Sequence, residues 1–263
     1  MIKLINIMPK EYLYEFDLSE DFNSLHMIMA HLILEDNTYA QWSKERKKLG
    51  RYVILDNSAP YFEHALDDIS LLKCIDLIEP NEVVLPDIIN NFKETVQRHL
   101  RFMELLRTKK YLKLMAVPQG NTLQEYIQAY KLFSSDKRIE VIGVSYTVDN
   151  LFAHKTIPKK YISSREYLIN ILHKKGILNT NKEHHLLGLS SSGNIELNRL
   201  KKFLFIRRCD SNAAYINAKR HITFVEHEGY EKQKVPINFN DTFDQQTYKL
   251  MVRNINVLTE ASR

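Results

Sequence analysis

Short apolar runs rich in β-branched residues alternate with longer amphipathic stretches along most of this chain. The runs are largely continuous, as burial on both faces of a parallel sheet requires. This alternation favours a TIM-type (β/α)8 barrel, with a doubly wound open sheet as the alternative. The runs predict eight strands, at residues 27–34, 51–56, 81–87, 111–119, 139–146, 184–190, 203–210 and 221–227.

Amphipathic patterns predict the helices between these strands. Between residues 91 and 110, apolar residues recur at spacings of three and four, which places them on one face of a helix. The segment after residue 212 has no clear helical pattern, so it is the weakest connection of a barrel. Similar patterns predict helices at 123–133, 164–178, 194–203 and 243–261.

Composition indicates one barrel domain over residues 1–263. Seven Gly and seven Pro are few, and no stretch has the composition of a linker. No apolar run is long enough to cross a bilayer, and acidic residues interrupt the region where a secretory signal needs its apolar core. The two cysteines, Cys74 and Cys209, form no disulfide framework or Cys-rich zinc site. We therefore expect a cytoplasmic protein with no membrane partner, metal or other cofactor.

Three aspartates follow predicted strands directly, at Asp56, Asp87 and Asp210. The carboxyl ends of parallel strands meet at one edge, where α/β enzymes bind their ligands. A single aspartate of this kind is more often a loop cap, but three together favour a site. Neighbouring carboxylates shift one another's pKa values, so one can stay ionised as a nucleophile while another carries a proton.

Such a pair of carboxylates suits the cleavage of a glycosidic bond. If the leaving group is a purine, its polar edge needs matching partners. Asp87 can accept hydrogen bonds from the base, Gln119 can donate and accept them, and Gly143 permits close backbone approach.

Five segments share their order and spacing with the motifs of a known enzyme superfamily. They are ILDNSAPYF (54–62), VVLPD (83–87), VPQGN (117–121), VIGVSY (141–146) and the run from Asp210 to Phe224. Through these segments, residues 51–227 resemble the tRNA-guanine transglycosylase superfamily, including its DNA-acting 7-deazaguanine branch. In the last run, Asn217-Ala218-Lys219 stands where the superfamily has Asn-Ala-Arg, at the same distance from the aspartate.

The resemblance implies a role for each motif residue. Asp210 would be the nucleophile that attacks C1′ of a nucleotide and forms a covalent intermediate, and Asp56 would be the acid/base group. The residues implied to bind the base are Asp87, Gln119, Gly120 and Gly143.

Two departures from the superfamily pattern bear on the substrate. Asn57-Ser58-Ala59 replaces a Gly-Gly pair, which implies a differently shaped pocket floor. The zinc-binding subdomain, built from three Cys and one His, is missing, since neither CxC nor CxxC occurs. Because that subdomain supports RNA docking in the superfamily, its absence favours DNA over tRNA.

The expected function is therefore the exchange of guanine in DNA for a free 7-deazaguanine base, as in phage DNA modification. Reaching C1′ requires base flipping or a single-stranded substrate. Three alternatives remain: a hydrolytic DNA glycosylase that leaves an abasic site, a non-catalytic nucleic-acid-binding barrel, and a small-molecule enzyme on the same fold.

Basic residues flank the predicted nucleophile. The net charge of +5 is compatible with a polyanionic partner, and equally with a role in solubility. Contacts with the nucleic-acid backbone explain these residues as well as salt bridges to neighbouring acids do. The residues concerned are Arg207, Arg208, Lys219 and Arg220.

Overall fold

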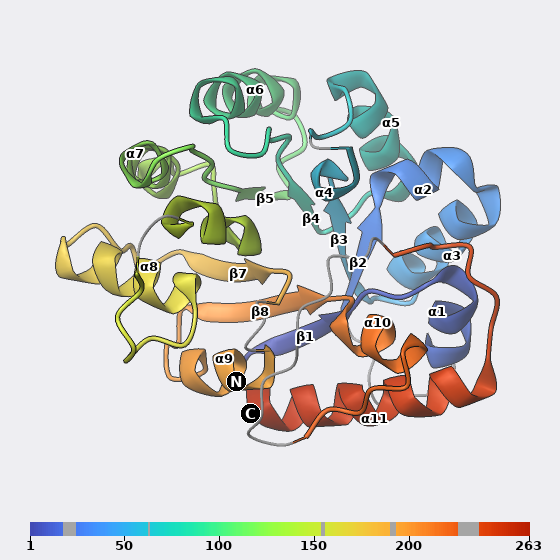
Figure 1. The fold of residues 1–263 in the computed structure, drawn as a ribbon. Coiled ribbons are helices and arrows are strands. Elements are labelled where there is room, and N and C mark those ends of the chain that lie inside the picture. Colours follow the sequence, from blue (N-terminus) through green and yellow to red (C-terminus); the bar gives the residue numbers. More distant parts are fainter. Residues whose placement is uncertain (18–24, 63, 154–155, 190–192, 226–236) are drawn as a thin grey trace. The chain divides into compact units, whose positions relative to one another are not determined.

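The computed structural model describes residues 1–17, 25–62, 64–153, 156–189, 193–225 and 237–263. Eight parallel strands alternate with helices in the (β/α)8 arrangement of a TIM-type barrel, which confirms the predicted fold class (Figure 1). The strands are β1 (Lys3–Asn6), β2 (Leu25–Met29), β3 (Tyr52–Asp56), β4 (Glu82–Val84), β5 (Lys113–Ala116), β6 (Val141–Ser145), β7 (Glu183–Leu187) and β8 (Ile206–Ser211).

Polar side chains cap the starts of several helices. Thr122 and Glu125 form a capping box at one, and Asp67 and Ser163 each accept a hydrogen bond from a first-turn N–H at two others. None of the helices in the described residues is long and apolar enough to span a membrane. The helices are α1 (Lys10–Asp17), α2 (Ala30–Glu35), α3 (Asn37–Lys48), α4 (Ala59–Phe62), α5 (Asp68–Ile78), α6 (Phe92–Leu105), α7 (Leu123–Ser135), the 3₁₀ helix η1 (Tyr146–Phe152), α8 (Ser164–Lys174), α9 (Gly193–Leu200), α10 (Ala213–Lys219) and α11 (Gln245–Ser262).

The chain divides into two compact units. The β3 unit comprises Ser24–Leu151 and Asn181–Glu183, and the β8 unit comprises Met1–Asn23, Phe152–Thr180 and His184–Arg263. The prediction of a single domain over residues 1–263 is not tested by this division and stays a prediction.

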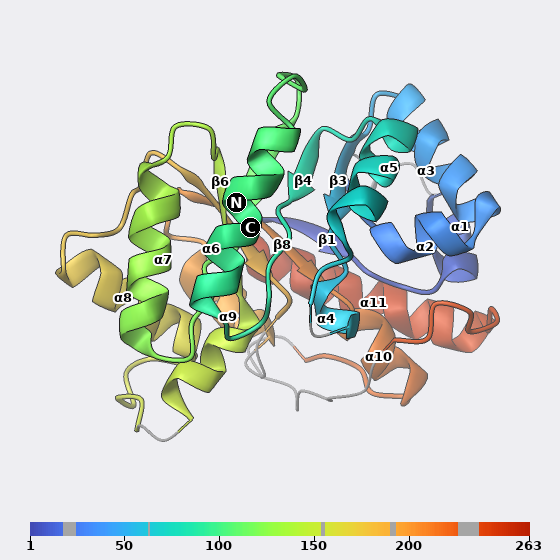
Figure 2. The ribbon, with the colours of Figure 1, turned by 90° about the horizontal axis from the view of Figure 1, so that it is seen from above.

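In the β3 unit, the strands follow the order β2-β3-β4-β5-β6 and pair in parallel. Val53, Ile54 and Leu55 in the middle of β3 are completely buried. Helices α2, α3 and α5 pack on one another, as Figure 2 shows. Buried apolar strands therefore fix the positions of the polar residues that follow them.

In the β8 unit, β8 lies between β1 and β7, and α11 packs against β1, α9 and α10 (Figure 1). The buried Asn254 of α11 fixes the segment that follows α10. Its Oδ1 accepts a hydrogen bond from the N–H of Phe224 at 2.7 Å, and its Nδ2 donates to the carbonyl of Ile222 at 3.0 Å.

The structure corrects three predictions from the sequence. The strand predicted at 221–227 is wrong, because residues 221–225 form no strand and Asn254 binds the Phe224 N–H; residues 226 and 227 lie outside the described residues. The missing strand is β1 instead. The strand predicted at 27–34 ends at Met29, and the rest of its apolar run forms α2, while α10 fills the connection that lacked a helix.

Candidate functional site

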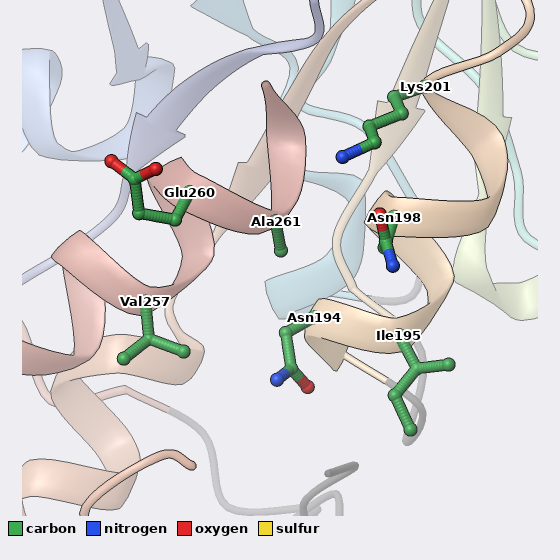
Figure 3. Close-up of a pocket in the computed structure, with 7 residues that line it drawn as sticks. All are labelled: Asn194, Ile195, Asn198, Lys201, Val257, Glu260 and Ala261. Atoms are coloured by element: carbon green, nitrogen blue, oxygen red, sulfur yellow. The ribbon is translucent and has the colours of Figure 1, made fainter. Parts of the chain in front are cut away.

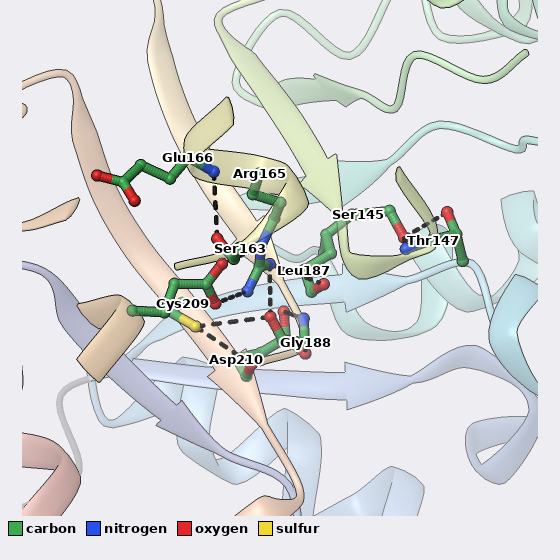
Figure 4. Close-up of polar contacts among 10 residues, drawn as sticks. Ser145, Thr147, Ser163, Arg165, Glu166, Leu187, Gly188, Cys209 and Asp210 are labelled. Atoms are coloured by element: carbon green, nitrogen blue, oxygen red, sulfur yellow. Dashed lines mark hydrogen bonds and ion pairs between the residues drawn. The ribbon is translucent and has the colours of Figure 1, made fainter. Parts of the chain in front are cut away.

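Asp210 lies at the carboxyl end of β8, where it pairs with Ile5 of β1. Its side chain is 15% exposed. Its Oδ1 lies 3.0 Å from Nε2 of His185. The Gly188 N–H donates to Oδ1 at 3.3 Å and to Oδ2 at 3.2 Å (Figure 4). Within the described part of the chain, no lysine or arginine pairs with Asp210. The carboxylate is therefore held by N–H donors without being neutralised by a permanent cation.

The Gly188 peptide is held from both sides. Gly188 has a φ of +69°, a conformation that glycine adopts without a steric penalty. Its N–H faces Asp210, while its carbonyl accepts a hydrogen bond from Nη1 of Arg165 at 2.6 Å (Figure 4). The orientation of this donor is thus set by Arg165.

Arg165 itself is fixed by a buried ion pair with Glu196. The two side chains are 1% and 0% exposed, and Nε of Arg165 donates to Oε1 of Glu196 at 3.1 Å. Arg165 comes from α8 and Glu196 from α9, so the pair joins two helices of the β8 unit. We call Arg165, His185, Gly188, Glu196 and Asp210 the Asp210 cluster.

Cys209 stands beside the cluster but is not a candidate nucleophile. Burial raises the pKa of its thiol well above the ordinary range, and the negative charges of Asp210 and Glu196 act in the same direction against Arg165. The thiol therefore stays protonated at neutral pH.

The basic residues predicted to contact phosphates have different surroundings. Arg207 and Arg220 are exposed. Lys219, at the end of α10, is also exposed and forms an ion pair with Asp241. Arg208 is only 6% exposed, so its burial gives a phosphate contact no support.

Asp87 and Gln119, both predicted to bind the base, are in direct contact in the β3 unit. The Gln119 Nε2 donates to Oδ2 of Asp87 at 2.6 Å, and the Asn57 Nδ2 donates to Oδ1 at 2.7 Å. Burial raises the pKa of Asp87, and the two amide hydrogen bonds oppose that shift. We call Asn57, Asp87 and Gln119 the Asp87 cluster.

Asp56 ends β3 and shapes the turn that follows. Its Oδ1 accepts a hydrogen bond from the N–H of Ser58 at 2.7 Å. Ser58 has a φ of +68°, so it adopts a conformation that costs a residue with a Cβ about 1 kcal/mol or more. Its Oγ lies 2.8 Å from Nδ1 of His31 and accepts from the His31 N–H at 3.2 Å. Burial lowers the pKa of His31, which favours the neutral imidazole.

We expect Ser58→Ala to lower the free energy of unfolding by about 1–3 kcal/mol, because the buried His31 N–H loses its acceptor. Urea unfolding at pH 7 measures this loss. The control is Ser135→Ala, since the exposed Ser135 donates only to the Leu132 carbonyl of its own helix. Equal stability losses in the two variants would contradict the assigned role of the Ser58 hydroxyl.

Gly120 precedes α7 in the sequence, and Gly143 follows it. A Cβ at Gly120 would stand 2.6 Å from the backbone nitrogen of Tyr126 and 2.8 Å from Cβ of Glu125, so close packing against α7 already requires glycine there. Gly143 is buried within β6. Their predicted contacts with a base stay predictions.

A separate pocket of about 280 Å³ lies between α9 and α11 of the β8 unit (Figure 3). None of the predicted site residues lines it. Its walls combine amides, a lysine and aliphatic side chains, namely Asn194, Ile195, Asn198, Lys201, Val257, Glu260 and Ala261.

Several residues of the two clusters were not predicted as functional. The sequence interpretation gave no catalytic or binding role to Arg165, Glu196, Gly188 and His185. Gly188 and His185 stand in the run HHLLGLS, which precedes the strand of the predicted nucleophile. Among the described residues, no group of three or more His, Cys, Asp or Glu side chains could hold a metal ion.

Comparisons with family models and with curated proteins found no relative of this chain. No protein-family model matches the chain, and no curated protein matches it. The resemblance to the tRNA-guanine transglycosylase superfamily therefore depends on the five sequence segments alone.

Proposed function

We propose that the protein is a base-processing enzyme that cleaves an N-glycosidic bond in DNA through a covalent intermediate on Asp210, exchanging guanine for a 7-deazaguanine. One observation carries the proposal: a partly exposed carboxylate at the carboxyl end of β8 is oriented by two N–H donors and has no Lys or Arg partner among the described residues. Such a carboxylate keeps its nucleophilic lone pairs available.

The first step forms a bond between an Asp210 oxygen and C1′. The bond from C1′ to the base nitrogen breaks, and its electron pair leaves with the base, which takes a proton from a general acid. The resemblance gives that role to Asp56, and its hydrogen bond from Ser58 N–H holds one of its oxygens in place.

The second step reverses these movements with a different base. The incoming base gives its ring proton to the acid/base aspartate, its nitrogen bonds to C1′, and the Asp210 carboxylate departs. If water attacks instead, the products are a free base and an abasic site, and the enzyme is a glycosylase.

Recognition of the base is assigned to the Asp87 cluster. Asp87 and Gln119 together present a carboxylate and an amide, which match the donors and acceptors of a purine edge. Because the two side chains bind each other in this structure, a base would have to replace part of that contact. The exposed Arg207, Lys219 and Arg220 support a role in binding the phosphates of the substrate.

The test is mass spectrometry of the free bases released from plain DNA, modified phage DNA and bulk tRNA, with and without a free 7-deazaguanine base. Release from DNA that requires the replacement base is the expected result, and it should disappear in Asp210→Asn. The matched control is Asp149→Asn, which changes an exposed aspartate outside both clusters. Release without a replacement base would identify a glycosylase, and no release from any substrate would overturn the proposal.

A further inference from the structure

The two oxygens of Asp210 have unequal surroundings. Oδ1 receives the His185 Nε2 at 3.0 Å and shares the Gly188 N–H, whereas Oδ2 has only the Gly188 N–H at 3.2 Å. Oδ1 is therefore the anchored oxygen, and Oδ2 keeps more of its lone-pair capacity.

His185 is placed by an irregularity in the pairing of β7 with β8. His184 pairs with Ile206 and His185 pairs with Arg208, so β8 carries one extra residue, Arg207, between them. A bulge of this kind re-aims the neighbouring side chains. The His184 ring packs on Phe205 with centroids 4.9 Å apart, while the His185 ring reaches Asp210.

The hydrogen-bond partners fix the tautomer of a neutral His185. Its side chain is 0% exposed, and its Nδ1 has no hydrogen-bond partner within the described parts of the chain. Its Nε2 faces the Asp210 carboxylate, whose oxygens accept hydrogen bonds. The hydrogen consequently lies on Nε2, and the imidazole acts as a donor to Oδ1.

The second donor is equally constrained. The left-handed conformation of Gly188 aims its N–H at the carboxylate, and the Arg165 guanidinium holds the carbonyl of the same residue. Both donors are thus set before any substrate arrives, which is the arrangement that makes such contacts effective in a reaction.

We infer that His185 is a positioning residue that anchors Oδ1 of Asp210 and leaves Oδ2 to attack C1′, while the Gly188 N–H holds both oxygens; this inference rests on the proposed function. The Oδ2 electron pair forms the new bond to C1′ as the bond to the base breaks. In the resulting ester, Oδ1 is the carbonyl oxygen and keeps the hydrogen bond from His185. When the incoming base bonds to C1′, the electron pair of the Oδ2–C1′ bond returns to the carboxylate, and the donors stabilise the recovered charge.

The kinetic test compares His185→Leu with His185→Gln. The leucine variant loses the donor, so we expect kcat to fall about 100-fold, with KM for DNA unchanged. Glutamine can place an N–H near the position of Nε2, and we expect it to restore most of kcat. Equal losses in the two variants, or a change confined to KM, would overturn the inference.

A second measurement does not depend on activity. The ¹⁵N chemical shifts of the His185 ring should show the hydrogen on Nε2 in the unaltered protein, and Asp210→Ala should speed the exchange of that hydrogen with water. A hydrogen on Nδ1 would overturn the donor assignment. If the unaltered protein releases no base, the proposed function fails, and the ring spectra still decide whether His185 donates to Asp210.

Discussion

Arg165→Leu should lower the free energy of unfolding by about 3–5 kcal/mol, because it removes the guanidinium that forms an ion pair with the buried Glu196 carboxylate. The side chain of Glu196 is 0% exposed, so water cannot replace the lost guanidinium. The carbonyls of Leu187 and Gly188 lose a donor at the same time. Urea unfolding followed by circular dichroism at pH 7 gives the difference.

Two further variants distinguish the effect of the buried Glu196 charge from the loss of stability that any lost ion pair would cause. Arg165→Leu combined with Glu196→Leu removes both charges and should recover most of the loss, since an apolar pair can replace a buried ion pair at little cost. Arg263→Leu breaks an exposed pair with Glu260 and should cost less than about 1 kcal/mol. A double variant no more stable than the single one would show that the buried charge of Glu196 is not the cause of the lost stability.

Strong periodicity accounts for the parts of the fold that the sequence predicts well. Helix α6 lies inside the range predicted at 91–110. Helix α7 begins where the range predicted at 123–133 begins and extends two residues beyond its end. The contact between Asp87 and Gln119 has a different explanation. The two residues follow β4 and β5, which are neighbouring parallel strands, so their side chains lie at the same edge of the sheet.

The errors come from interactions between segments far apart in the chain. Nothing near residue 224 reveals that its N–H will be bound by Asn254, thirty residues later, and so cannot join a strand. An apolar run also does not distinguish a strand from a buried helix, which explains why residues 30–34 were predicted as part of a strand. Strand β1 is short, with four residues, and its burial pattern is not continuous.

The supports of Asp210 were missed for a related reason. Arg165 looks like an ordinary polar residue in the first turn of a helix, and its burial depends on Glu196 from another helix. His185 is one of ten histidines, and only the pairing of β7 with β8 singles it out. The sequence can therefore indicate Asp210 as a candidate, while the groups that orient its side chain depend on tertiary contacts.

His99 should make the protein lose stability as the pH falls below about 6.5. The residue is fully buried in α6 and packs edge-on against Phe133, with ring centroids 4.5 Å apart. Burial lowers its pKa to about 3; the nearby Leu85 backbone opposes this shift, and Arg98 adds to it.

The direction of the effect follows from proton binding. Between about pH 6.5 and 3, His99 takes up a proton in the unfolded chain but not in the folded one, so acid favours unfolding by about 1.4 kcal/mol per pH unit. The loss reaches about 2 kcal/mol at pH 5.

We expect His99→Leu to remove this part of the pH dependence, so that the stability difference between pH 7.5 and pH 5 shrinks by about 2 kcal/mol. Urea unfolding at the two pH values measures it, with His173→Leu on the exposed side of α8 as the matched substitution. If His99→Leu keeps the full pH dependence of the unaltered protein, the folded protein must accommodate a charged His99, and the core around Phe133 must open to water in acid.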